Sequence, residues 1–336
     1  MQILVRGTNW IGDAVMTIPA IRKLRRMFPD AYLALQMRPG AKGVLEQTEL
    51  FDEIITPRGF LEQVKELRKR RFDLAIVFPN SFSSALAVRM AGVERSFGYA
   101  TERRSFLLSD AVHMPEWKDS RHEVYYYREL IGAVEKSFFG RIMEPDDLEP
   151  RLTVSSSRQN QARETLHAHG VDLNRKTVAI APGSTNSRAK RWIPERFAQL
   201  NDRIQSELGS NVILLGSPDD KPISREVADH STFGPIDMTG ETGIDSATAI
   251  LGEVDLLISN DMGLAHLAPA VGTETIVIFG PTNQVTTRPY SEHASIISAN
   301  VECAPCMLRD CPIDHRCMTR VTVEEVFRKA AELLSE

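Results

Sequence analysis

The sequence lacks any uninterrupted apolar stretch of the ~18–20 residues that a membrane-spanning helix requires. It also lacks a charged leader followed by an apolar segment at its start, where the strand-like residues Ile3-Leu4-Val5 stand instead. A signal peptide is therefore not expected. These two absences predict a protein that stays in the cytoplasm.

An excess of positive charge is lacking too, because 40 Lys and Arg residues stand against 45 Asp and Glu residues, a net charge of −5. This balance argues against a general nucleic-acid-binding protein. Positive charge is nevertheless concentrated in two predicted helices, in Arg22, Lys23, Arg25 and Arg26 and in Arg68, Lys69, Arg70 and Arg71. Each cluster is either a solvated helix face or a surface for an anionic acceptor or a membrane.

Cysteine is scarce, and the four cysteines all fall in one short segment, at Cys303, Cys306, Cys311 and Cys317. In a reducing compartment, such a cluster is more typical of metal ligands or free thiols than of a disulfide framework. Three interpretations stay open: a structural Zn or Fe site, reduced thiols without metal, and disulfides formed after purification.

What the sequence does have is length and a regular alternation. Its 336 residues exceed one ordinary core, so two domains of ~150 residues are expected. Strand-like and helical patterns alternate in the first half, become irregular between 140 and 153, and alternate again from 178. We predict an α/β protein with two Rossmann-like, doubly wound domains facing across a cleft. Their predicted bounds are 1–155 and 172–320, followed by a C-terminal helix at 321–336.

The most informative segment, 254–281, predicts a strand, a polar loop, a helix from about Leu264 and a second strand. Its loop contains Asp261 and leads into His266. In open parallel sheets, ligands bind at the carboxyl ends of the strands, which is where this loop lies. The alternative is an Asp that caps a helix and a His that packs on it.

Two other loops follow predicted strands. In the loop 7–13, Gly7 and Gly12 permit a tight turn, but the glycines lack the spacing of a dinucleotide-binding fingerprint. The loop ends in Asp13, which is either a helix cap or a catalytic base. The loop 181–192 offers glycine, hydroxyls and three cations, including Lys190. Such a loop has the chemistry of a phosphate cradle, although an exposed basic loop is the alternative.

Five segments together, GTNWIGDAVM, PNSFSSAL, APGSTNSRAKRW, SNDMGLAH and IVIFGPT, resemble the family 9 glycosyltransferases in order and spacing along nearly the whole chain. The resemblance implies a GT-B fold. It also implies metal-independent, inverting transfer of heptose from ADP-heptose to the first heptose of the lipopolysaccharide inner core. Transfer to another acceptor position, or from another nucleotide sugar, is the alternative.

The resemblance also assigns roles to residues. Asp13 matches the general base, and Lys190 would hold the departing phosphates. The expected donor-binding residues are Ser184, Thr185, Met238, Asp261, Gly263 and His266, with Met238 near the adenine. The expected acceptor-binding residues are Asn80, Ser81 and Arg58. Met262 departs from the small hydroxyl residue that is more common at its position in the family.

The expected partners follow from the same resemblance: ADP-heptose, the lipid A–inner core acceptor and the inner-membrane surface, which the protein would contact peripherally. We expect no nucleic-acid partner, and we expect the protein to be a monomer. No cofactor is expected for catalysis, and the only expected metal is the structural Zn or Fe at the cysteines.

Overall fold

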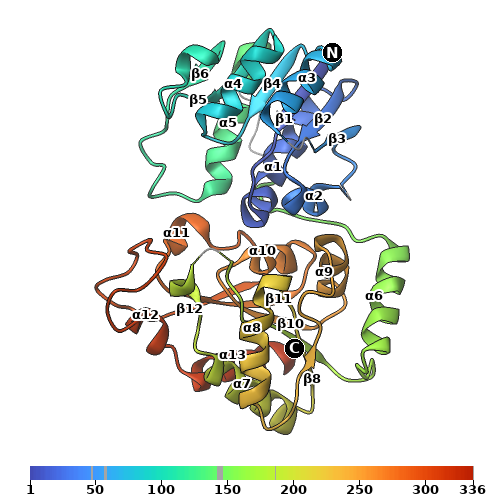
Figure 1. Ribbon diagram of the computed structural model, residues 1–336, viewed down its shortest axis with the longest axis vertical. Coiled ribbons are helices and arrows are strands. Elements are labelled where there is room, and N and C mark those ends of the chain that lie inside the picture. Colours follow the sequence, from blue (N-terminus) through green and yellow to red (C-terminus); the bar gives the residue numbers. More distant parts are fainter. Residues whose placement is uncertain (47, 57–58, 142–146, 186, 336) are drawn as a thin grey trace. The chain divides into compact units, whose positions relative to one another are not determined.

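The computed structural model describes residues 1–46, 48–56, 59–141, 147–185 and 187–335. The chain divides into two compact units, Met1–Pro150 and Arg151–Glu336 (Figure 1). The division falls in the irregular stretch that the sequence places before the second alternation of strands and helices. Helix α6 (Ser156–Ala168) lies between the two predicted domain ranges and belongs to the second unit.

The first unit is a six-stranded parallel sheet with helices on its faces. Its strands are β1 (Gln2–Arg6), β2 (Tyr32–Gln36), β3 (Glu53–Ile55), β4 (Leu74–Val77), β5 (Arg95–Tyr99) and β6 (Asp110–Val112). Its helices are α1 (Ile11–Met27), α2 (Pro39–Leu45), α3 (Phe60–Arg70), α4 (Phe82–Ala91), the 3₁₀ turn η1 (Ser105–Leu107) and α5 (Glu123–Phe139). The strand order is β3-β2-β1-β4-β5-β6, so the chain reverses its direction across the sheet between β1 and β4.

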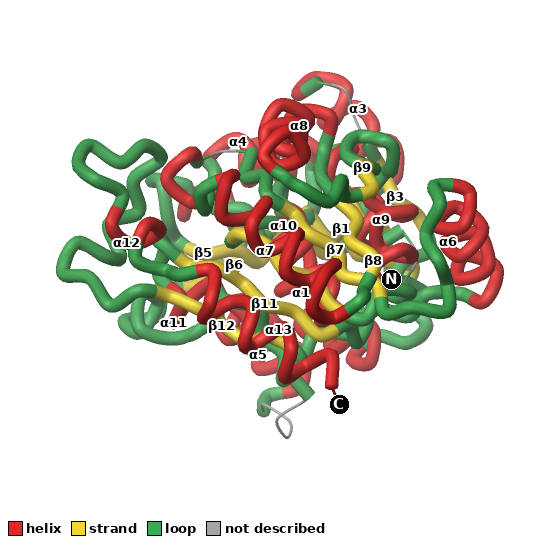
Figure 2. The backbone as a smooth tube through the Cα atoms, turned by 90° about the horizontal axis from the view of Figure 1, so that it is seen from below, coloured by secondary structure: helices red, strands yellow, loops and turns green. Residues whose placement is uncertain are grey.

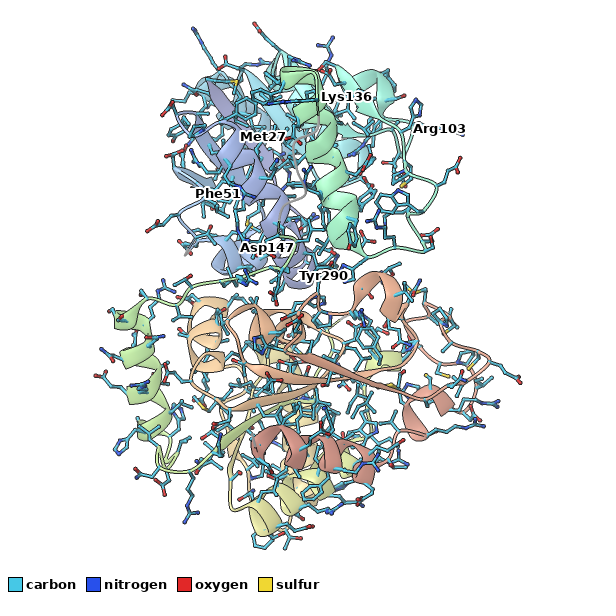
Figure 3. The ribbon with its side chains drawn as sticks, turned by 180° about the vertical axis from the view of Figure 1, so that it is seen from behind. Met27, Phe51, Arg103, Lys136, Asp147 and Tyr290 are labelled. Atoms are coloured by element: carbon cyan, nitrogen blue, oxygen red, sulfur yellow. The ribbon has the colours of Figure 1, made fainter. Side chains whose placement is uncertain are left out.

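Alternating strand residues bury both faces of this sheet. Leu4 and Val77 face a cluster that includes Leu67 of α3 and Val88 of α4. Helices α1 and α5 pack side by side (Figure 3, where Met27 and Lys136 mark their C-terminal parts). Because both faces are covered, the strands carry apolar residues almost without interruption, which is typical of a parallel sheet.

The second unit repeats this architecture with strands β7 (Thr177–Ala181), β8 (Asn211–Leu214), β9 (Ile236–Asp237), β10 (Leu256–Asn260), β11 (Glu274–Phe279) and β12 (Ala294–Ser298). Besides α6, its helices are η2 (Arg188–Lys190), α7 (Pro194–Leu208), η3 (Pro218–Asp220), α8 (Lys221–His230), α9 (Ile244–Leu251), α10 (Gly263–Ala270), α11 (Gln284–Thr287), α12 (Arg316–Thr319) and α13 (Val323–Ser335). The parallel strands are yellow in Figure 2.

The strand order in the second unit is β12-β11-β10-β7-β8-β9, which reverses between β7 and β10. Its main core joins apolar residues of β7, β10 and β11 to those of α7 and α13, with Ile258 and Phe197 among them. The sequence predicts Thr322 as N-cap of the last helix, with Glu325 in the capping-box position. The structure confirms this at the start of α13: the Glu325 amide donates to Thr322 Oγ1 (3.2 Å), and the Thr322 amide donates to a Glu325 carboxylate oxygen (2.8 Å). The α/β class with two Rossmann-like units is thus confirmed.

Three details of the sequence interpretation were wrong. Gly12 lies inside α1 rather than in the turn before it. The strand expected at 254–258 is β10, two residues further on. The sequence pattern predicts a helix from Glu123 to Val134, but α5 continues for five more residues to Phe139, and Gly140 then ends it with a φ of 72°.

Candidate functional site

The reversal between β7 and β10 brings two of the predicted loops together in the second unit. The register pairs Ile180 with Ile258 and Ala181 with Ser259, so the two strands end at the same level. The loop that contains Lys190 follows β7, and Asp261 directly follows β10. In open α/β sheets, such a reversal point at the carboxyl ends of the strands is where ligands bind.

An ion pair joins these loops. Lys190 Nζ lies 2.7 Å from Asp261 Oδ2, to which the Thr282 hydroxyl also donates at 2.7 Å. The carboxylate is buried, whereas the Lys190 side chain is 26% exposed. A cation that is anchored from one side and open on the other can accept a second anion. The N-cap of α10 is Met262, so the alternative reading of Asp261 as the cap was wrong.

Asn260 holds the cradle loop in shape. Its amide donates to the Pro182 carbonyl at 2.7 Å, and its Oδ1 accepts from the Trp192 amide at 2.9 Å. Asn260 and Trp192 are completely buried. The sequence pattern places Asn260 in the polar loop, whereas it is the last residue of β10. The available signal was a strong hydrogen-bonding amide at the end of an otherwise apolar strand, where a backbone partner is needed.

A second contact fixes the other end of this loop. A Cβ atom on Gly183 would lie 2.1 Å from Asp220 Oδ1, so only glycine fits there. The Asp220 carboxylate is buried and accepts from the Ser217 amide (2.9 Å) and hydroxyl (2.6 Å). The loop backbone is therefore pressed against a capping turn that precedes α8.

The other predicted donor residues of the second unit differ in their exposure. Ser184 is buried and Thr185 is exposed, while Gly263 is the first residue of α10 and His266 is buried within it. Met238, expected to line a base pocket, is completely buried. Of the three cations in the loop, Arg188 is 79% exposed and pairs with Asp310 at 2.7 Å, and Arg191 donates to the Ser184 carbonyl at 3.1 Å.

The first unit has a cavity of about 340 Å³ at its own reversal point. Strands β1 and β4 are neighbours there, pairing Arg6 with Val77. The lining residues come from the loops after these two strands and from the region of α5: Thr8, Asn9, Trp10, Asp13, Phe78, Pro79, Asn80, Ser81, Lys118, Glu123, Tyr126 and Tyr127. The structure thus brings Asp13 together with Asn80 and Ser81, which are 67 and 68 positions away.

Asp13 is the third residue of α1, in the first turn, where the helix dipole stabilises a carboxylate. The N-cap is Trp10, so Asp13 is not the cap. The Tyr127 hydroxyl of α5 hydrogen-bonds to it. Burial, followed by the negative charge of Asp13, raises the pKa of Tyr127 well above its usual value. Tyr127 therefore stays a neutral donor that orients the carboxylate toward the cavity.

Asn80 and Ser81 are held by a residue that the sequence analysis missed. Arg104 is completely buried, and its guanidinium donates to Tyr99 O (3.0 Å), Ser81 O (3.1 Å) and Asn80 Oδ1 (3.4 Å), and also to the Pro79 carbonyl. Burial lowers its pKa to about 10, so it remains charged at neutral pH. Nothing in the local sequence distinguishes it from its neighbour Arg103, which is exposed.

Lys118 and Tyr126 complete the cavity wall. The Lys118 ammonium is paired with Glu123 and lies 4.6 Å from the Tyr126 ring centroid. The Asn80 amide donates to the Tyr126 hydroxyl at 2.9 Å. Burial raises the pKa of Tyr126 to about 12. Arg58, the third predicted acceptor residue, lies outside the described residues.

The four cysteines form no disulfide. Cys317 is buried in the core of the second unit, while Cys303 and Cys306 are exposed on the preceding loop. Burial, and then the charges of the other three thiols, raises the pKa of Cys317 to about 11. Over the described part of the chain, no three of the sulfurs lie within 4.8 Å of one another.

Two Rossmann-like units in one chain, each with polar groups gathered at its reversal point, define a GT-B glycosyltransferase fold. The model of glycosyltransferase family 9 (heptosyltransferase) matches residues 61–316, and the chain belongs to this family.

Individual relatives agree with the family match. The chain is 28% identical to a lipooligosaccharide heptosyltransferase 2 of Haemophilus influenzae, with 100% of both chains covered. It is also 28% identical to the lipopolysaccharide heptosyltransferase 2 of Escherichia coli K12, over 88% of each chain. The structure of the E. coli ADP-heptose lipopolysaccharide heptosyltransferase II superposes with a TM-score of 0.86 at 26% identity, covering 99% of this chain and 98% of that one. Among the described helices, none is both long and apolar enough to cross a bilayer.

Proposed function

We propose that this glycosyltransferase moves heptose from ADP-heptose to the first heptose of the lipopolysaccharide inner core. The single observation that carries the proposal is the Lys190–Asp261 pair at the reversal point of the second unit, in a chain whose relatives are named heptosyltransferase 2. A half-exposed lysine on a buried carboxylate suits a nucleoside diphosphate. The carboxylate and the Thr282 hydroxyl suit the hydroxyl groups of a sugar.

The chemistry divides between the two units. Asp13 takes the proton from an acceptor hydroxyl as that oxygen bonds to the anomeric carbon of the heptose. The bond from this carbon to the ADP oxygen breaks on the opposite face, and the configuration inverts. ADP leaves as a stable anion, so no general acid is needed. Lys190 stabilises the charge that grows on the phosphate, and no metal ion is required for the reaction.

In the first unit, the loop 79–81 and Lys118 would bind the acceptor. Asn80 offers an amide beside Asp13, and the cavity of about 340 Å³ suits one sugar residue. In this proposal the enzyme acts as a monomer at the cytoplasmic surface of the inner membrane, where its lipid-linked acceptor is located.

A donor and acceptor screen tests this function. Purified protein is incubated with ADP-heptose, ADP-glucose or UDP-sugars, together with inner-core acceptors that carry no heptose or one heptose. We expect transfer only with ADP-heptose and only to the acceptor with one heptose. Transfer to the heptose-free acceptor would assign a different acceptor position, and transfer from a UDP-sugar would refute the donor.

We also propose that Cys303, Cys306, Cys311 and Cys317 bind one structural Zn or Fe ion. Four thiols in one segment could supply all four ligands of a tetrahedral site, and the segment 303–317 contains few apolar residues to order it. Binding would draw the exposed loop toward Cys317, which the core holds. Elemental analysis of protein purified without a metal-affinity step should find about one ion per chain. A value near zero, with all four thiols reactive, would refute this site.

A further inference from the structure

A groove of about 630 Å³ lies on the first unit between α3 and α4, away from the residues assigned to catalysis. Its apolar lining is Leu61, Val64 and Met90, and its other lining residues are all cations: Lys65, Arg68, Lys69 and Arg71. No carboxylate lines it among the described residues. An apolar floor with a purely cationic rim is the composition of a surface that binds a negatively charged, partly apolar partner.

The cations of this groove are available to a partner. Among the described residues, Lys65, Lys69 and Arg71 form no ion pair, and Arg68 donates to the Met90 carbonyl at 2.5 Å. The neighbouring Arg70 is different, because it pairs with Glu53 at 2.6 Å and with Glu66. One of the two acidic residues of α3 is thus already neutralised beside the groove.

In the other basic cluster of the sequence, on α1, cations form ion pairs within the first unit. Lys23 is buried against Glu135 at 3.1 Å, and Arg25 pairs with Asp52 at 2.7 Å. These cations stabilise the first unit itself. The two clusters look alike in sequence. In the α3 cluster, however, Arg70 alone is paired with carboxylates among the described residues, and Arg68, Lys69 and Arg71 line the groove instead.

Large apolar side chains surround the groove. Leu61 is 77% exposed and Met90 is 41% exposed. Exposed large apolar side chains next to basic ones are typical of a surface that contacts a membrane interface.

We propose that the α3–α4 groove docks on an anionic phospholipid surface. The cations contact lipid phosphates, and Leu61 and Met90 enter the boundary between head groups and acyl chains. The proposal rests in part on the proposed function, because a lipid-linked acceptor requires the enzyme to work at a membrane. Helix α4 connects the two features: it begins next to Ser81 of the cavity and, after ten residues and ~15 Å, ends near Met90 of the groove.

Vesicle sedimentation without any acceptor or donor tests the docking. We compare wild-type protein with Lys65→Glu/Lys69→Glu and with a charge-matched control, Lys136→Glu/Arg225→Glu, whose two cations are exposed elsewhere. Wild type and control should bind phosphatidylglycerol vesicles and not phosphatidylcholine vesicles, and about 0.5 M salt should release them. Each lysine near an anionic surface contributes about fivefold, so the groove variant should bind at least ~25-fold more weakly.

A second variant separates a lipid surface from free phosphate. Leu61→Ser should bind anionic vesicles several-fold more weakly than wild type, and inorganic phosphate at about 10-fold excess over lipid should not displace the wild-type protein. Equal loss in the charge-matched control, binding to neutral vesicles, or displacement by phosphate would overturn the proposal. Heptose transfer to a detergent-dispersed acceptor should be unchanged in Lys65→Glu/Lys69→Glu. The docking and the proposed function can therefore fail independently.

Discussion

Replacing Arg104 by methionine is the sharpest test of how the cavity in the first unit is built. The side chain is completely buried, and it satisfies the backbone carbonyls of Pro79, Ser81 and Tyr99. Methionine fills a similar volume but donates no hydrogen bond. Each carbonyl left buried without a donor costs about 1–3 kcal/mol.

Removal of a buried charge without a carboxylate partner offsets part of this cost. We therefore expect the free energy of unfolding to fall by about 3 kcal/mol. For units of this size, the melting temperature would drop by about 6–12 °C. The loop 79–81 loses the hydrogen bonds from Arg104 that hold its backbone, and Asn80 keeps only Tyr126 as a side-chain partner. KM for the acceptor should therefore rise about tenfold or more, while the affinity for ADP, which the second unit binds in our proposal, should not change.

The assay is thermal unfolding together with acceptor kinetics and ADP calorimetry on the same preparations. Arg103→Met is the matched control, because this neighbouring arginine is exposed. Arg104→Lys should restore part of the stability through one or two of the lost hydrogen bonds. Wild-type melting and an unchanged acceptor KM in Arg104→Met would refute the positioning role of Arg104.

Three further predictions concern the second unit and the metal question. Lys190→Ala should weaken ADP binding by about 10–100-fold and also slow transfer, because the Lys190 charge contacts phosphate in both the ground state and the transition state. Arg188→Ala in the same loop is the control and should leave the ADP affinity unchanged. If calorimetry shows equal ADP affinities for wild type and Lys190→Ala, Lys190 lies outside the donor site. Gly183→Ala should destabilise the protein by about 2–3 kcal/mol and impair ADP binding, because the added Cβ would lie 2.1 Å from Asp220 Oδ1. Gly234→Ala is the control: its added Cβ would have no neighbouring atom within 4 Å, so its melting temperature should equal that of the wild type. Activity should survive EDTA in an assay without added Mg²⁺, and a strict requirement for a divalent ion would contradict a metal-independent transfer.

The sequence predicted most of the fold because its strands are short apolar segments bounded by polar turns, and its helices have clear signals such as the Thr322–Glu325 capping box. The sequence also placed the three candidate loops (7–13, 181–192 and the loop at Asp261) at the carboxyl ends of strands. This placement follows from the alternation of strands and helices alone. Element ends were less predictable, as in β10, because the residues before and after a buried strand can be equally apolar.

The positioning residues could not be predicted in the same way. Arg104 contacts Ser81, 23 positions away, and Asn260 contacts Pro182, 78 positions away, so their neighbours in sequence carry no sign of their roles. Similarly, carboxylates from other elements pair with Lys23 and Arg25 of the α1 cluster but, in the α3 cluster, with Arg70 alone among the described residues. Such distinctions depend on tertiary packing, which a one-dimensional pattern does not contain.

The role of Asp13 is the central claim, and one comparison tests it most directly: turnover and ADP-heptose affinity of Asp13→Asn beside those of the wild type. The substitution keeps the size of the side chain and its hydrogen bond to Tyr127 but removes the base. We expect kcat to fall by about 10²–10⁴-fold with nearly unchanged donor affinity, because the base acts on the acceptor. A variant that retains more than about a tenth of the wild-type kcat would show that Asp13 is not the base.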